Sequence, residues 1–177
     1  MLNRNESLLC IIDLQGSLFR VMAEKEELLE NAQKLVAGAR ILGIPLLLTE
    51  QVNLGNTIGE IKRATGDIPA IVKASFSCWQ DEVFRERLIG LNRRQVILIG
   101  IEAHICVYQT ARDLIKHGYD VHVAADGISS RRHLNREIAL RRMEREGVYL
   151  TSTEMILFEL LETALDPKAR EIFRIVK

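Results

Sequence analysis

The chain has 177 residues, 47% hydrophobic and 27% charged, which is typical of a globular protein and excludes a disordered, collagen-like or membrane protein. Its 24 Lys and Arg residues balance 24 Asp and Glu residues, so no net field attracts nucleic acid or an anionic membrane. We therefore expect neither of these partners, and a chain of this length predicts one domain over residues 1–177.

The first apolar run and the cysteines indicate the compartment. Residues 8–12 are apolar but the run ends at Asp13, which is too short for a secretion signal or a membrane span. Cys10, Cys78 and Cys106 lack the spacing of a disulfide framework or of a CxxC zinc site. We therefore expect a cytoplasmic protein whose thiols must be considered one by one.

Short runs of β-branched residues or leucine recur along the chain, and longer stretches with helical spacing follow them. The expected strands are residues 8–13, 45–49, 71–73, 95–100, 120–124 and 148–151. Continuous apolar runs such as residues 96–99 indicate strands that are buried on both faces. The alternation predicts an α/β fold with a doubly wound parallel sheet.

The stretches between the expected strands have the spacing of amphipathic helices. Apolar residues recur every three to four positions over residues 28–42, and residues 103–117 and 132–146 behave alike. Gly43, Gly118 and Gly147 follow these stretches where glycine commonly ends a helix. Further helices are expected from Ser152 and Pro167, whereas residues 51–70 predict a long loop with at most a brief helix.

Three chemically complementary residues fall at the carboxyl ends of the expected strands, where such sheets bind ligands. Asp13 ends the first strand, Lys73 ends the third, and Cys106 follows the fourth in the expected first turn of a helix. The positive end of that helix and the Lys73 ammonium would favour a Cys106 thiolate. We therefore predict Cys106 as a nucleophile, with Asp13 carrying protons and Lys73 stabilising charge.

The remaining candidates carry weaker signals. Cys10 is expected inside the first strand, whereas Cys78 and Trp79 could either line a pocket near Lys73 or pack in the core. No HxH, DxH or HExxH spacing indicates a metal site, and no GxGxxG or GxxxxGK[ST] motif indicates a nucleotide. We expect no metal and no cofactor.

One segment makes the sequence recognisable. Residues 100–107, which read Gly-Ile-Glu-Ala-His-Ile-Cys-Val, resemble the central signature of the isochorismatase-like cysteine hydrolases, and residues 110–114 and 118–121 continue it. Other segments resemble the flanking motifs of this family: Asp13-Leu14-Gln15 with Phe19, Lys73 with Phe76 and Ser77, and residues 126–131.

The resemblance implies a three-layer α/β/α, Rossmann-like sheet of about six strands in the order 3-2-1-4-5-6. It also implies an Asp13-Lys73-Cys106 triad, a cis peptide before Glu102, and an oxyanion hole formed by the backbone amides of Glu102 and Cys106. The substrate pocket is expected to be lined by Gln15, Phe19, Glu50, Gln51, Phe76, Trp79, Ile101 and Ile105.

The sequence departs from the metal-containing branch of the superfamily. Nicotinamidases carry an Asp-x-His cluster where this chain reads Thr49-Glu50-Gln51, so we expect a metal-free hydrolase. The leading hypothesis is hydrolysis of a small molecule, a carboxamide, through a covalent Cys106 intermediate.

Other interpretations stay open. One is vinyl-ether hydrolysis of an isochorismate-like acid, in which Asp13 is the acid and no covalent intermediate forms. Another is a non-catalytic, oligomeric binding protein of the same fold. The apolar residues of segment 155–161 indicate a homo-oligomer, a dimer or larger, although they could equally pack on their own sheet.

Overall fold

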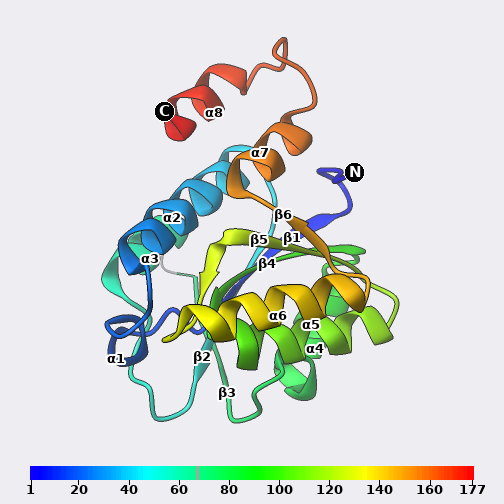
Figure 1. Ribbon diagram of the computed structural model, residues 1–177. Coiled ribbons are helices and arrows are strands. Elements are labelled where there is room, and N and C mark those ends of the chain that lie inside the picture. Colours follow the sequence, from blue (N-terminus) through cyan, green and yellow to red (C-terminus); the bar gives the residue numbers. More distant parts are fainter. Residues whose placement is uncertain (67) are drawn as a thin grey trace.

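A six-stranded sheet organises the computed structural model, which describes residues 1–66 and 68–177 (Figure 1). The strands are β1 (Ser7–Ile12), β2 (Leu46–Gln51), β3 (Ile71–Lys73), β4 (Gln95–Ile101), β5 (Asp120–Ser129) and β6 (Tyr149–Thr151). They lie in the order β3-β2-β1-β4-β5-β6, and every neighbouring pair is parallel. The predicted fold class and strand order are confirmed.

Helices cover both faces of the sheet and form the three layers (Figure 1). One face carries α2 (Lys25–Ile41), α3 (Gly59–Thr65), α7 (Thr153–Leu161) and α8 (Ala169–Val176). The other face carries α4 (Glu82–Gly90), α5 (Tyr108–Lys116) and α6 (His133–Arg145). Three short elements complete the chain: α1 (Gly16–Phe19), the 3-10 turn η1 (Cys78–Gln80) and the π-helical turn η2 (Ala103–Val107).

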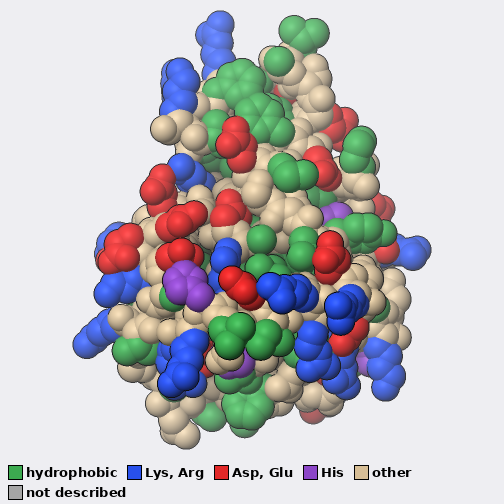
Figure 2. Space-filling model, viewed as in Figure 1, with side chains coloured by type: hydrophobic (Ala, Val, Ile, Leu, Met, Phe, Trp, Pro, Cys, Tyr) green, Lys and Arg blue, Asp and Glu red, His purple; other side chains and the backbone are tan. Residues whose placement is uncertain are grey.

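The central strand shows why the apolar runs form a sheet covered on both sides. All six residues of β1 are buried; Leu9 and Ile11 pack toward α2, whereas Leu8, Cys10 and Ile12 pack toward α4 and α5. Cys10 is therefore a core residue, as expected. Charged side chains of both signs are interspersed on the surface seen in Figure 2, including the part over α6.

Several elements differ from the sequence prediction. Strand β5 continues to Ser129 instead of ending at residue 124, because a register shift leaves extra residues between the pairs Leu98–Val123 and Gly100–Ile128. Asp126 in this bulge accepts hydrogen bonds from the Thr153 backbone and hydroxyl, which ties the start of α7 to β5. The brief helix expected in residues 51–70 is α3, and residue 67 lies outside the described part of the chain.

The sequence analysis missed α1 and α4. Helix α1 has only four residues, too few for a periodic pattern. Helix α4 buries only Phe84 and Leu88, so it has a weak apolar stripe, although the Asp81 side chain caps its start by accepting from the Phe84 amide. A narrow stripe is the kind of signal that spacing alone does not detect.

Gly100 allows β1 and β4 to approach at the point where the candidate site begins. Its φ is +126°, and a Cβ atom there would lie 2.0 Å from the Ile12 carbonyl oxygen. No side chain fits at that distance, and the backbone conformation itself favours glycine. Glycine at this position therefore sets the distance between the strands that carry Asp13 and Cys106.

We expect Gly100→Ala to lower the free energy of unfolding by at least about 3 kcal/mol, because strain in φ adds to a backbone clash. Urea unfolding followed by circular dichroism measures this change. The control is Gly90→Ala in α4, where a Cβ atom meets nothing within 4 Å. An unchanged midpoint for Gly100→Ala would show that the strands can separate without cost.

Candidate active site

The three predicted catalytic residues meet at the carboxyl edge of the sheet. Asp13 directly follows β1, Lys73 is the last residue of β3, and Cys106 lies in η2 just after β4. Strands β1 and β4 are neighbours from the two halves of the sheet, which is where the strand order reverses. This is the switch point at which doubly wound folds place their ligands.

A buried ion pair joins Asp13 and Lys73. Lys73 Nζ lies 2.7 Å from Asp13 Oδ2, and the two side chains are only 0% and 1% exposed. The Thr49 hydroxyl donates to the other carboxylate oxygen, Oδ1, at 2.7 Å. Asp13 has a φ of +52°, a conformation that aspartate tolerates better than most residues. Breaking such a pair typically costs about 3–5 kcal/mol, because one charge is left buried without a partner.

Oxygen atoms surround the Lys73 ammonium. Besides Asp13, it donates to Gln51 Oε1 at 2.7 Å and to the Ser75 carbonyl at 3.2 Å. Burial alone would lower the pKa of Lys73, but the nearby thiols and the Asp13 carboxylate outweigh it and raise that pKa above its ordinary value. Lys73 is therefore a fixed positive charge whose three N–H groups are all engaged.

The Cys106 thiol sits beside this pair and is nearly buried. The residue is 7% exposed, and its Sγ lies 4.0 Å from Gln51 Oε1, to which the thiol donates. Burial raises the pKa of the thiol well above its ordinary value, the Asp13 carboxylate raises it further, and the Lys73 ammonium opposes both. This differs from the expectation of a ready thiolate, because the Lys73 ammonium does not offset burial next to a carboxylate.

Glu102 ties η2 to the segment after β5. The peptide bond between Ile101 and Glu102 is cis, and the Glu102 side chain is nearly buried. Its Oε1 accepts from the Arg131 backbone amide at 3.1 Å and from Arg131 Nε at 3.0 Å. Nearby, His104 binds Ser130 through Nδ1 and Asn135 through Nε2. The hydrogen bonds of the Glu102 and His104 side chains fix the turn that presents Cys106. The oxyanion hole at the Glu102 and Cys106 amides stays a prediction.

Three expected pocket residues are occupied by bonds within the protein. Gln15, which is fully buried, binds the backbone amide and carbonyl of Gln51 through its side chain. Glu50 Oε1 accepts from the amide and hydroxyl of Thr57, both at 2.7 Å. Gln51 uses its side chain for Lys73 and for the Ala74 carbonyl. These side chains hold the rim of the site together.

The other expected pocket residues occupy different environments. Phe76 is 55% exposed, and Ile105 is partly buried one residue before Cys106. Phe19 packs at the edge of the core under α2, and Ile101 is fully buried in that core. Trp79 requires a correction, because its ring stacks on His117 at 4.2 Å, at the far end of α5 from Cys106.

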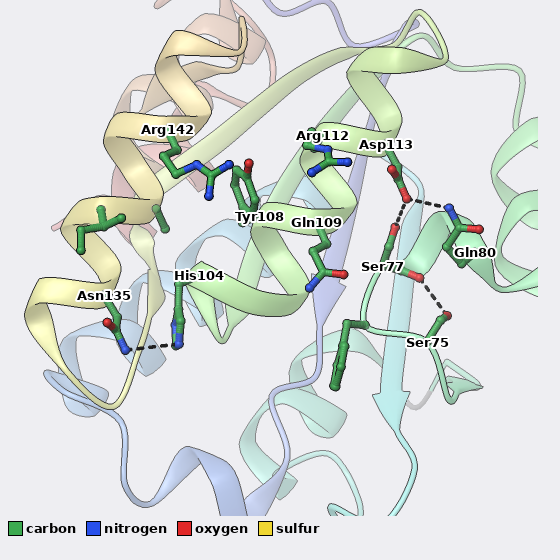
Figure 3. Close-up of a pocket in the computed structure, with 13 residues that line it drawn as sticks. Ser75, Ser77, Gln80, His104, Tyr108, Gln109, Arg112, Asp113, Asn135 and Arg142 are labelled. Atoms are coloured by element: carbon green, nitrogen blue, oxygen red, sulfur yellow. Dashed lines mark hydrogen bonds between the residues drawn. The ribbon is translucent and has the colours of Figure 1, made fainter.

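A hollow of about 700 Å³ opens beside the site, between α5, α6 and the segment after β3 (Figure 3). Its wall includes Phe76, His104 and Tyr108, with Arg142 lying over the Tyr108 ring. On the opposite side, Asp113 accepts from Ser77 and Gln80, as Figure 3 shows. Lys73 Nζ lies 3.4 Å from the carbonyl oxygen of Phe76, so the hollow lies next to the site.

Thr49 and Arg131 belong to the site but were not predicted. Thr49 pairs with Ile12 in the β1–β2 register, which places its hydroxyl next to Asp13. Arg131 lies in a run of arginines that looks like an ordinary solvated surface.

Among residues 1–66 and 68–177, no three His, Cys, Asp or Glu side chains are grouped to hold a metal ion. In the same part of the chain, none of the helices has the length and apolarity that a bilayer crossing requires.

Comparison with known proteins places this geometry in a family. The family model described as Isochorismatase domain matches residues 7–155. The chain belongs to the isochorismatase family. It is 34% identical to "Secreted isochorismatase effector Isc1" of Phytophthora sojae, over 98% of this chain and 85% of that protein. The resemblance predicted from the signature around Cys106 is confirmed.

Solved structures share the fold of this chain. The MAR1 ribonuclease of Caenorhabditis elegans superposes with a TM-score of 0.93 at 34% identity, covering 99% of this chain and 91% of that one. The YcaC gene product of Escherichia coli, described as an octameric hydrolase of unknown specificity, superposes with a TM-score of 0.92 at 24% identity, covering 98% and 89%. This isochorismatase-family chain thus has relatives with different descriptions, so its own reaction must be argued from its site.

The raised pKa of Cys106 predicts the pH dependence of its alkylation. The iodoacetamide labelling rate is expected to rise about tenfold per pH unit up to about pH 10, because only the thiolate reacts and a raised pKa keeps its fraction small. Asp13→Asn removes a negative charge, so its profile moves to lower pH and labelling at about pH 8 becomes roughly tenfold faster. Peptide mass spectrometry measures both rates.

Labelling of wild-type Cys106 that levels off below about pH 8.5 contradicts the raised pKa. Partial burial slows the reaction at every pH alike, so it does not change the slope. Cys10 and Cys78 serve as internal references, because both are fully buried.

Proposed function

We propose that this isochorismatase-family chain is a cysteine hydrolase that cleaves a small carboxamide through a covalent Cys106 intermediate. The carrying observation is the contact of a thiol with a buried carboxylate–ammonium pair at the switch point of the sheet. Cys106 is 7% exposed, so it is largely shielded from solvent, which suits a covalent intermediate. The Asp13, Lys73 and Cys106 roles belong to this proposal.

In the first step, Cys106 Sγ attacks the carbonyl carbon while Asp13 accepts the thiol proton. Because burial raises the pKa of the thiol, the proton must pass to Asp13 before or during the attack. The tetrahedral oxyanion is stabilised by the backbone amides of Glu102 and Cys106, where loss of one donor would cost about 3–4 kcal/mol of barrier. Asp13 then gives its proton to the leaving nitrogen, and ammonia departs from a thioester on Cys106.

In the second step, water attacks the thioester carbonyl. Asp13 accepts a proton from the water, the C–S bond breaks, and the proton returns to Cys106 as the acid is released. Lys73 keeps its positive charge throughout and remains the partner of the Asp13 carboxylate. Each proton thus moves through one carboxylate, and thiol and carboxylate regain their starting states.

Incubation with a panel of small primary carboxamides and rapid acid quenching should show an acyl group on the Cys106 peptide by mass spectrometry. The adduct should be absent in Cys106→Ala, and turnover should fall at least about 10³-fold in that variant and in Asp13→Asn. The buried Cys10 and Cys78 peptides provide the control for unspecific acylation.

A second function is favoured by the similarity to Isc1, which is described as an isochorismatase effector. Here Asp13 would protonate the vinyl ether of an isochorismate-like acid, and Cys106 would take no part. Turnover of that acid without an adduct, retained in Cys106→Ala and lost in Asp13→Asn, would replace the amidase proposal. Loss of turnover in both variants together with an adduct supports it.

We also propose that the chain forms homo-oligomers in the cytoplasm. Most of the late apolar segment packs on its own sheet, but Met155 and Phe158 are 55% and 40% exposed, and YcaC is an octamer. Light scattering should give a mass of at least two chains, and the mass of one chain would contradict this. The three free thiols suit a reducing compartment, which cell fractionation would check.

A further inference from the structure

The side chain of Gln51 links the Lys73 ammonium to the Cys106 thiol. Its Oε1 accepts from Lys73 Nζ at 2.7 Å and faces Cys106 Sγ at 4.0 Å. Its Nε2 donates to the Ala74 carbonyl at 2.7 Å, which fixes which end of the amide points to Lys73. Both ends of the amide are therefore engaged within the protein: the oxygen with Lys73 and Cys106, and one N–H with Ala74.

The backbone of Gln51 is held as firmly as its side chain. The buried Gln15 side chain accepts from the Gln51 amide at 2.7 Å and donates to the Gln51 carbonyl at 2.9 Å. Gln51 also pairs with Lys73 in the β2–β3 register. The position of Oε1 between Lys73 and Cys106 is thus set by the sheet, by Gln15 and by Ala74, independently of any ligand.

We propose that Gln51 is a positioning residue whose single carboxamide oxygen orients both the Lys73 ammonium and the resting Cys106 thiol. The inference rests on the proposed nucleophilic role of Cys106, and it replaces the expectation that Gln51 lines the substrate pocket. No proton passes through the amide, which is neutral and acts only as an acceptor.

The choice of a neutral acceptor has a chemical consequence. A hydrogen bond from the thiol to Oε1 stabilises the protonated form, and an acceptor oxygen beside a thiolate would destabilise it. Gln51 also holds one Lys73 N–H group that would otherwise be free to donate to a thiolate. Both effects keep Cys106 as an oriented thiol until a substrate approaches and Asp13 takes the proton.

The test is the pH profile of iodoacetamide labelling at Cys106 in two variants of similar side-chain length. Gln51→Met removes the acceptor, so the profile should move to lower pH and labelling at about pH 8.5 should be at least about threefold faster. Gln51→Glu adds a negative charge, so the profile should move to higher pH and labelling should be at least about tenfold slower. Gln33→Met and Gln33→Glu on the exposed face of α2 are matched controls and should leave the profile unchanged.

Shifts of the same sign in both Gln51 variants, or none beyond the Gln33 controls, would overturn the proposal, because a purely structural role predicts no opposite effects. If the Gln51 variants do not fold, a measurement on the wild type tests the proposal instead. Subtracting the Raman spectrum of Cys106→Ala from that of the wild type isolates the S–H band of Cys106, which should have the lowered frequency of a hydrogen-bonded thiol. A free-thiol frequency overturns the proposal. If these results hold but no carboxamide acylates Cys106, the proposed function fails and the role of Gln51 stands.

Discussion

The buried ion pair between Lys73 and Asp13 is the interaction on which the rest of the site depends. Two charges removed from water are costly unless geometry and further hydrogen bonds compensate for the lost hydration. Thr49 and Gln51 of β2 and the Ser75 carbonyl in the segment after β3 provide those bonds. The parallel sheet therefore does more than place three residues together, because its β1–β2 and β2–β3 registers bring the compensating groups.

This arrangement changes how Cys106 must be activated. A thiol beside an unpaired lysine would lose its proton readily. Here the Asp13 carboxylate raises the pKa of Cys106 more than the Lys73 ammonium lowers it. The pair as a whole carries no net charge, so burial dominates and keeps the thiol protonated. In the proposed reaction, the same carboxylate that prevents ionisation at rest becomes the base during attack. Gln51 adds to this by giving the resting thiol an acceptor.

The places of the six strands and the family could be predicted from the sequence because they rest on local signals, and the strand order followed from the family resemblance. Continuous apolar runs predicted the sheet, and the motif around Cys106 predicted both the family and the residues that meet at its edge. The role of Thr49 depends on strand register and that of Arg131 on a contact across 29 positions, neither of which a local pattern encodes.

The environments of Trp79, Gln15, Gln51 and Cys106 differ from the expected ones because they depend on contacts that a local sequence pattern does not encode. Trp79 lies only six residues after Lys73, yet the turn η1 directs its ring to His117 at the other end of α5. Gln15 and Gln51 were expected in the pocket from the family resemblance, and the structure shows that their side chains bind the backbone and Lys73. The raised pKa of Cys106 depends on burial, which the sequence does not state.

The most direct test of the account is the protonation state of Cys106 at rest. An NMR titration of the Cys106 Cβ resonance, with Cys106→Ala for assignment, reports the thiol without any substrate or reagent. The account predicts a thiol resonance that persists beyond about pH 9 in the wild type and a transition at lower pH in Asp13→Asn. A wild-type transition below about pH 8 would show a thiolate ready at rest and would contradict the account.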